Sequence, residues 1–380
     1  MITTINNKHK KLNVPNLRFP EFQGEWKEHK LEDITAEIGD GIHATPIYDD
    51  NGTFYFVNGN NISEYGIIIT ATTQKVTEEE ALRNNASALN SYSILLSING
   101  TVGNVVLYKN ESIMLGKSAC YINVSSNINR NYIFYYLMMP KCQFYFTSEL
   151  TGTTIKNLSL KSVRKTKVLL PNANEQSKIA RLFDAINERI ATQNKIIDKL
   201  QSLIKGIAQN IVRNNKPNVR LSECLECKSS TLQESDVCEQ GTYPVYGANG
   251  IVGYLDNYNT EGEAVYIIKD GSGVGTVSYV KGKCSATGTL NTLQAKEGYS
   301  LQYLYYLLKV FNFEPYKTGM AIPHIYFKDY GKAKFFCPSY TEQLQYTQLL
   351  SAIDNKLSIE QNILTELTLQ KQCLLRQMFI

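Results

Sequence analysis

The chain has 380 residues, 43% of them hydrophobic and 19% charged, with a formal net charge of +4 and eight cysteines. These values are typical of a globular protein with room for two domains. No window approaches the roughly 18 apolar residues of a membrane span, and the polar start predicts no signal peptide, so we expect a cytoplasmic protein with reduced thiols. The mild net charge permits nucleic-acid binding only where basic groups cluster.

The first elements in chain order are a polar N-terminal tail, 1–24, and a body that we expect over 25–171. Short β-rich runs at 52–62, 92–108 and 166–171 alternate with turns rich in Gly, Asn and Asp. The spacing becomes helical at NYIFYYLM, 131–138. The first body is therefore predicted to be a mixed α/β domain.

A long amphipathic helix is predicted next, within a helical spacer over 172–216. Apolar residues step by four and three from Ile179 to Ile211, interrupted only at Gln193. This is the seam pattern of a coiled coil, in which a lone polar residue costs stability and can fix the register. The polar, proline-containing stretch RNNKPNV, 213–219, leads into the next body.

The same order follows again. A second body is expected over 217–338, with a β-rich run at 263–280 and a helical stretch, LQYLYYLL, at 301–308. A second helical spacer over 339–380 carries a seam from Tyr346 to Met378, interrupted at Glu360 and Lys371.

The two tails match without a gap when the chain is shifted by 167 positions. Gln193 and Glu360 then occupy the same place in the seam. Upstream of the tails the likeness is patchier and lies at other offsets, as where INGTVGNVV (98–106) loosely echoes KDGSGVGTV (269–277). Matching pairs include Thr151–Gly152 with Thr318–Gly319, and Pro171, Glu175 and Gln176 with Pro338, Glu342 and Gln343.

Two seams in one register favour an antiparallel coiled coil between the helices. The bodies would then be related by an approximate two-fold and sit at opposite ends of a rod. The alternative is that each helix lies on its own domain.

Sequence patterns that resemble catalytic, cofactor-binding or metal-binding motifs are incomplete in this chain. GSGVGT (271–276) precedes a strand and not a helix, which favours a hairpin turn over a dinucleotide loop. LGKS (115–118) lacks the earlier glycine of a phosphate-binding loop. CLEC (224–227) has zinc-like spacing but no second close pair, and the four histidines show no metal or triad pattern. We therefore expect no catalytic site, no metal and no cofactor on this chain.

Residues suited to binding nucleic acid do occur near the end of each body. Five basic residues and no acidic one lie between Thr151 and Leu170, and the matching segment also begins with Thr-Gly. Such loops suit phosphates and base edges, while an ordinary solvated basic face is the alternative. The candidate DNA contacts are Thr151, Thr153, Thr154, Lys156, Asn157, Lys161, Arg164 and Lys165, with Lys269, Ser272, Lys317, Thr318, His324, Lys328 and Lys332.

This duplicated order resembles the DNA-specificity subunit of a type I restriction–modification system. PNLRFPEFQGEWKEHKLEDI (15–34) is similar to the start of many bacterial members. The stretch 243–280 resembles the core of a common target-recognition domain, and the likeness covers nearly the whole chain.

The resemblance implies that each body is a target-recognition domain reading one half of a bipartite, asymmetric site in the major groove. The paired helices would set the unread spacer and dock two methyltransferase subunits. Those partners would hold S-adenosylmethionine and methylate adenine, and restriction subunits would use ATP and Mg to translocate and cleave DNA. The candidates for helix pairing and partner docking are Ile186, Ile190, Gln193, Ile197, Leu200, Ile353, Leu357, Glu360, Leu364 and Leu367.

Two other classes stay open. One is a methyltransferase or nuclease with unrecognised motifs, which would bind S-adenosylmethionine or act on DNA alone. The other is a coiled-coil adaptor for proteins, which would show no salt-dependent binding to duplex DNA.

Overall fold

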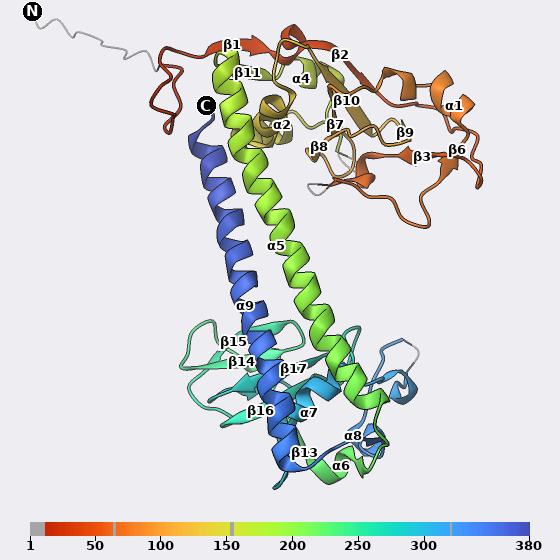
Figure 1. Cartoon of the computed structure of the whole chain (residues 1–380), viewed down its shortest axis with the longest axis vertical. Coiled ribbons are helices and arrows are strands. Elements are labelled where there is room, and N and C mark those ends of the chain that lie inside the picture. Colours follow the sequence, from red (N-terminus) through yellow and green to blue (C-terminus); the bar gives the residue numbers. More distant parts are fainter. Residues whose placement is uncertain (1–11, 64–65, 153–155, 320) are drawn as a thin grey trace, which may run out of the picture. The chain divides into compact units, whose positions relative to one another are not determined.

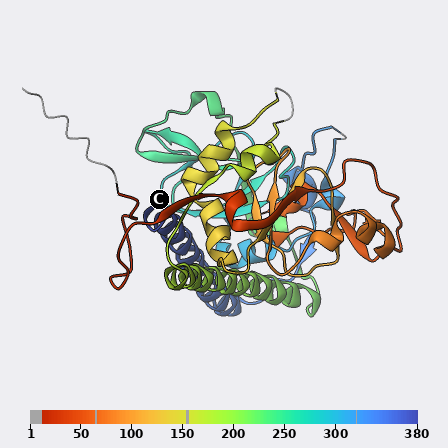
Figure 2. The same ribbon diagram turned by 90° about the horizontal axis from the view of Figure 1, so that it is seen from above.

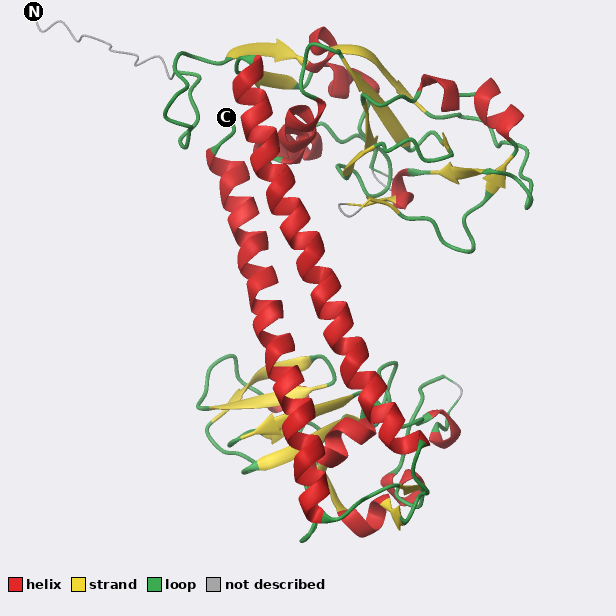
Figure 3. Cartoon of the chain, viewed as in Figure 1, coloured by secondary structure: helices red, strands yellow, loops and turns green. Residues whose placement is uncertain are grey.

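The computed structural model describes residues 12–63, 66–152, 156–319 and 321–380 (Figure 1). The chain divides into two compact units. Unit 1 comprises Met1–Thr192 and Leu364–Ile380, and unit 2 comprises Gln193–Ile363. The boundaries fall inside two long helices, α5 (Ala173–Arg213) and α9 (Tyr340–Gln377), which are continuous in Figure 3. Both predicted long helices are thereby confirmed.

Unit 1 is a mixed α/β body. Its strands are β1 (Lys27–Lys30), β2 (Thr35–Asp40), β3 (Phe54–Val57), β4 (Ile62–Ser63), β5 (Gly66–Ile67), β6 (Lys75–Val76), β7 (Ser93–Ser97), β8 (Val105–Leu107), β9 (Ile113–Leu115), β10 (Ala119–Val124) and β11 (Lys167–Leu170). Its shorter helices are α1 (Glu78–Arg83), α2 (Arg130–Met138), α3 (Pro140–Ser148) and α4 (Leu160–Arg164).

Unit 2 contains a second mixed α/β body. Its strands are β12 (Val219–Arg220), β13 (Leu225–Ser229), β14 (Tyr243–Gly247), β15 (Gly250–Leu255), β16 (Glu263–Ile268), β17 (Val277–Lys281), β18 (Ser285–Ala286), β19 (Leu290–Ala295) and β20 (Lys334–Phe335). Its shorter helices are α6 (Leu221–Cys224), α7 (Leu301–Leu308) and α8 (Phe327–Tyr330). The stretch 271–276 is the turn between antiparallel β16 and β17, as predicted.

The two bodies share one topology. The four-stranded sheet β2-β10-β7-β8 has its match in β13-β19-β16-β17, and β6-β3-β9 has its match in β15-β14-β18. Each three-stranded sheet contains one parallel pair, β3 with β9 and β14 with β18. The short pair β1-β11 corresponds to β12-β20. The internal repeat of the sequence is therefore a repeat of three sheets of the fold, including bodies whose sequences have diverged, whereas the pair β4-β5 of unit 1 has no match among the described sheets of unit 2.

The core of unit 1 gathers aromatic rings from α2, α5 and the end of the chain. Phe379 packs against Tyr132, Tyr136 and Phe183, with ring centroids 5.3, 5.8 and 5.7 Å away. Tyr135 packs on Phe183 at 4.9 Å, and α2 lies beside the first half of α5 (Figure 1 and Figure 2). All five side chains are buried. The repeated tyrosines thus pack helices together.

The repeated glutamine joins each body to its helix. Gln176 Nε2 donates to the Pro171 carbonyl at 2.9 Å, and its Oε1 accepts from the Asn129 amide at 3.1 Å. In unit 2, Gln343 makes the same two bonds, to the Pro338 carbonyl (2.9 Å) and the Ser300 amide (2.8 Å). Asn129 and Ser300 are the N-caps of α2 and α7. The glutamine is therefore repeated because it satisfies two backbone groups at each junction.

The seams of α5 and α9 face apolar neighbours within each unit. Gln193, Ile197, Leu357, Glu360 and Leu367 are buried, and Ile186, Ile190, Leu200, Ile353 and Leu364 are half-buried. In unit 2, Ile204 and Ala208 of α5 share a pocket with Leu357 of α9 and Tyr306 of the body. Each helix therefore packs on the other helix and on a body, so both alternatives that the sequence left open are partly realised.

The polar seam residues meet inside unit 2. Gln193 Nε2 donates to the Glu360 carbonyl at 2.9 Å and also to its carboxylate. Lys356 Nζ lies 2.5 Å from the same carboxylate. These hydrogen bonds, from Lys356 first and Gln193 second, lower the pKa of Glu360. Because the pair is satisfied only when the two positions face each other, it specifies one register of the helices.

An N-terminal segment fastens both helix ends in unit 1. The Arg18 guanidinium forms a two-pronged pair with Glu175, with Nε–Oε1 at 2.7 Å and Nη2–Oε2 at 2.8 Å. The Glu175 side chain has no exposed surface. The Leu17 amide donates to the Gln377 carbonyl at 2.9 Å. This segment therefore contacts the start of α5 and the end of α9 together.

Candidate nucleic-acid interface

Each body ends in a Thr-Gly loop that closes on itself. The Thr151 amide donates to the Asn157 carbonyl and the Asn157 amide donates back, both at 2.9 Å. In unit 2, Thr318 and His324 exchange the same bonds at 2.9 and 2.8 Å. The glycines have φ of +91° (Gly152) and +87° (Gly319), which residues with a side chain rarely adopt. The positive φ thus explains why the glycine of each loop is repeated.

Both loops dock on a glycine-containing turn of the four-stranded sheet. Asn157 bridges to Asn99, and His324 bridges to Asp270. The next residue of each loop also donates to this turn, Leu158 to the Ile98 carbonyl at 2.8 Å and Ile325 to the Lys269 carbonyl at 2.9 Å. The loose echo between 98–106 and 269–277 is therefore a structural equivalence.

The candidate contacts of unit 1 lie on this loop and on α4. Thr151, Lys156, Lys161 and Lys165 are exposed and Asn157 is half-buried. Arg164 differs, because its Nη2 donates to the Ile38 carbonyl at 2.7 Å and so ties α4 to β2. Thr153 and Thr154 lie outside the described residues.

Four candidate contacts of unit 2, Thr318, His324, Lys328 and Lys332, match those of unit 1, whereas Lys269 and Ser272 lie on the turn that receives the loop. Thr318 and Ser272 are exposed, Lys269 and His324 are half-buried, and Lys328 and Lys332 lie exposed in and just after α8.

Several of these cations have internal partners. Lys317 pairs with Glu314 at 2.5 Å, and Lys332 lies 3.9 Å from Asp329. Lys328 lies 5.2 Å from the centre of the Tyr326 ring. These exposed pairs are weak and leave the cations available to phosphates.

Two histidine pairs beside the loops were missed by the sequence analysis. His43 Nε2 lies 2.8 Å from Asp40 Oδ2, and His324 Nδ1 lies 2.6 Å from Asp270 Oδ1. The first pair has a three-residue spacing that the sequence displays. The second joins residues 54 positions apart, so only the docked loop reveals it.

In unit 1 the docked loop borders a pocket of about 270 Å³. Asp40, His43, Asn99, Lys117 and Asn157 line it together. The pocket therefore collects donors and acceptors of several kinds beside the Thr-Gly loop.

Cys224 and Cys227, the two cysteines with zinc-like spacing, differ in their surroundings. Cys224 is buried in α6, and a hydrogen bond with Cys337 lowers its pKa. Burial raises the pKa of Cys227 to about 11. All eight cysteines are free thiols. Among the described residues, no group of three or more His, Cys, Asp or Glu side chains is placed to hold a metal ion.

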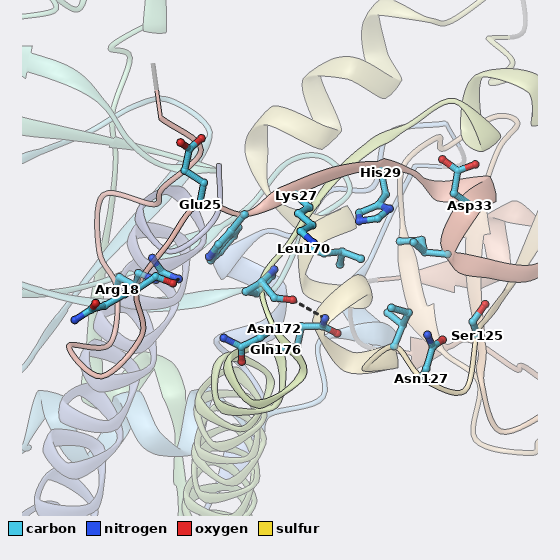
Figure 4. Close-up of a pocket in the computed structure, with 15 residues that line it drawn as sticks. Arg18, Glu25, Lys27, His29, Asp33, Ser125, Asn127, Leu170, Asn172 and Gln176 are labelled. Carbon is cyan, nitrogen blue, oxygen red and sulfur yellow. Dashed lines mark hydrogen bonds between the residues drawn. The ribbon is translucent and has the colours of Figure 1, made fainter. Parts of the chain in front are cut away.

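A larger polar pocket, of about 490 Å³, lies in unit 1 where the N-terminal segment meets the start of α5. Figure 4 shows Lys27, His29, Asp33 and Asn127 around it, with side chains of both charges. The dashed bond in that view is the one from Gln176 to the Pro171 carbonyl. This pocket belongs to the junction of body and helix, apart from the Thr-Gly loop.

No helix within the described residues combines the length and the apolar character that a membrane span requires.

The chain matches a protein-family model and is similar to several known proteins. The family model for the type I restriction modification DNA specificity domain matches residues 23–202 and 215–369. A Mycoplasma genitalium protein named as a type I specificity subunit is 24% identical over 311 residues, covering 76% of this chain and 80% of that protein. The specificity subunit of the Escherichia coli type I restriction enzyme EcoprrI is 22% identical over 330 residues, covering 80% and 81%.

Solved structures agree in fold. The crystal structure of a type I restriction–modification S subunit from M. genitalium has a TM-score of 0.65 at 19% identity, covering 97% of this chain and 99% of that one. A chain from a structural study of complex assembly and conformational transition in a type I system has a TM-score of 0.54 at 15% identity, covering 97% and 99%. With two matched copies of the family domain, this chain belongs to the type I restriction–modification DNA specificity family, whose members are non-catalytic specificity subunits.

Proposed function

We propose that the two bodies of this chain each read one half of a bipartite, asymmetric site in duplex DNA. The observation that carries the proposal is one topology used twice with different sequences, each copy carrying a Thr-Gly loop that is followed by lysines at matched positions. One scaffold can then offer equivalent phosphate contacts while its divergent side chains meet different bases.

The long helices would separate the readers and receive partners. α5 has 41 residues, about 60 Å at 1.5 Å per residue. Outside the seam, large apolar side chains stay exposed, including Leu203 (48%), Leu349 (50%), Ile359 (53%) and Leu369 (52%). Exposed apolar groups on a helix face suit docking by another protein. We assign that role to two methyltransferase subunits.

The proposed division of labour places all catalysis on partners, within the cytoplasm. Methyltransferase subunits would hold S-adenosylmethionine and methylate adenine, and restriction subunits would use ATP and Mg to translocate and cleave DNA. This chain would bind none of these cofactors.

The test is methylome sequencing of cells that carry this chain with a cognate methyltransferase subunit. Methylated adenines should define a bipartite motif, and exchange of residues 25–171 for the body of another specificity subunit should change one half-site only. Changes in both half-sites, or in neither, would contradict the two-reader proposal. Methylation by the isolated chain would instead show an enzyme, and assembly without salt-dependent duplex binding would show a protein adaptor.

A further inference from the structure

The docked loops place different side chains at one position of a shared scaffold. We call this position the loop junction, and it consists of Asn99 and Asn157 in unit 1 and of Asp270 and His324 in unit 2. In both units the junction residues are joined by an antiparallel bridge, and the following loop residue donates to the turn. The backbone bonding at the junction is therefore the same in both units, although the side chains differ.

The surroundings of the junction also differ at matched positions. Asp40 pairs with Cys120 of β10, and Ser229 pairs with Asn291 at the same place in β19. Lys117 stands two residues before β10, where Gly288 stands two residues before β19. Two charged residues that line the pocket of unit 1, Asp40 and Lys117, are thus replaced in unit 2 by Ser229 and Gly288.

The lysines beside the junction, in contrast to the junction residues, are identical in the two units. Lys161 of α4 matches Lys328 of α8, and Lys165 matches Lys332, all four exposed. Groups that are identical in both units cannot tell two half-sites apart, but they can hold the phosphates of any duplex. The difference between the readers must come from positions such as the junction.

The junction side chains have the chemistry of base-edge contacts. An asparagine amide matches the donor and acceptor that adenine presents in the major groove, and an aspartate accepts from the cytosine amino group. When His324 Nδ1 donates to Asp270, the opposite ring nitrogen of the neutral imidazole is an acceptor. His324 and Asp270 each keep 35% of their side-chain surface exposed. Their mutual contact holds the two side chains in place, and their exposed surface can still contact DNA.

Resting on the proposed function, we propose that the loop-junction side chains are specificity-determining residues. Asn99 and Asn157 select base pairs in the half-site of unit 1, and Asp270 and His324 select those in the half-site of unit 2. The matched lysines hold the DNA backbone without choosing sequence.

The experiment exchanges the junctions in the full chain, assembled with its methyltransferase subunit. Asn99→Asp with Asn157→His gives unit 1 the junction of unit 2, and Asp270→Asn with His324→Asn does the reverse. We expect each double variant to change the methylated motif in its own half-site and to leave the other half-site intact. Methylation of the original motif at full level by both variants would overturn the proposal.

A second measurement covers variants that assemble but methylate poorly. Asn157→Ala and His324→Ala complexes are bound to a randomised duplex pool and the bound sequences are counted. Discrimination at one or more positions of one half-site should fall by about 5- to 150-fold, since a good base contact contributes about 1–3 kcal/mol. Unchanged discrimination at every position would refute the assignment.

Matched controls come from the lysines. Lys161→Ala and Lys328→Ala should weaken binding to all duplexes alike and reduce the salt slope by about 1, with the motif unchanged. The outcomes also separate the two proposals. An unmodified complex without a bipartite motif would remove the proposed function, whereas a bipartite motif indifferent to the junction would remove only this inference.

Discussion

Removal of the repeated glutamine should loosen the junction of body and helix in one unit at a time. Gln176 is 3% exposed and Gln343 is 1% exposed, and each satisfies one carbonyl and one amide of the backbone. Replacement by alanine leaves both groups unpaired. In each unit one of the two bonds is fully buried and the other is partly exposed. At about 1–3 kcal/mol for a buried unpaired group and less for the other, we expect a cost of about 2–3 kcal/mol in either unit.

Amide hydrogen exchange reports this cost locally, which matters because a chain with two units need not unfold in one step. In Gln176→Ala, exchange at Asn129 should accelerate by about 30- to 150-fold, with Ser300 unchanged. Gln343→Ala should show the reverse. Gln345→Ala is the matched control, because Gln345 is an exposed glutamine of the same helix, α9. Equal acceleration of both amides in either variant, or of neither, would refute the reasoning.

Four further changes test other contacts. Arg18→Ala strands the buried Glu175 carboxylate and should cost about 3–5 kcal/mol in urea unfolding of unit 1, with Arg18→Lys intermediate; a loss below about 1 kcal/mol would contradict this. Because the pKa of Glu360 is lowered in the folded chain from its ordinary value of 4.5, its contribution to stability is complete above that value and is lost as the pH falls through the folded pKa. Glu360→Gln should therefore flatten the acid limb of a plot of unfolding free energy against pH, and an unchanged acid limb would contradict this. Phe379→Ala removes a buried ring and should cost about 3–5 kcal/mol, and an unchanged melting temperature would argue against the aromatic core. Seven residues inserted after Gln193 and seven after Glu360 keep the seam phase and add about 10 Å, so methylome sequencing should show a spacer up to about three base pairs longer; an active variant with the old spacer would show that the helices do not measure DNA.

The sequence by itself determined the elements whose signal is local. The four-three spacing from Ile179 to Ile211 predicts a helix, and α5 spans Ala173–Arg213. The strand after GSGVGT excludes a helix N-terminus there, and the turn between β16 and β17 confirms it. The tails matched at a fixed offset, with looser echoes between the bodies, predicted one architecture used twice, and this required no knowledge of which strands pair.

The tertiary structure alone decided how distant segments meet. The parallel pairing of β3 with β9, the bond of Gln176 to the Asn129 amide, and the docking of Phe379 on Phe183 join residues far apart in the chain. The same holds for Asp270 and His324, 54 positions apart, which the Thr-Gly loop brings within 2.6 Å. The spacing of apolar residues shows which face of a helix or strand is buried, because side chains at a fixed spacing along the element point to the same side. It carries no record of the partner on that face, since the partner is set by sheet register and by side-chain packing across the folded chain.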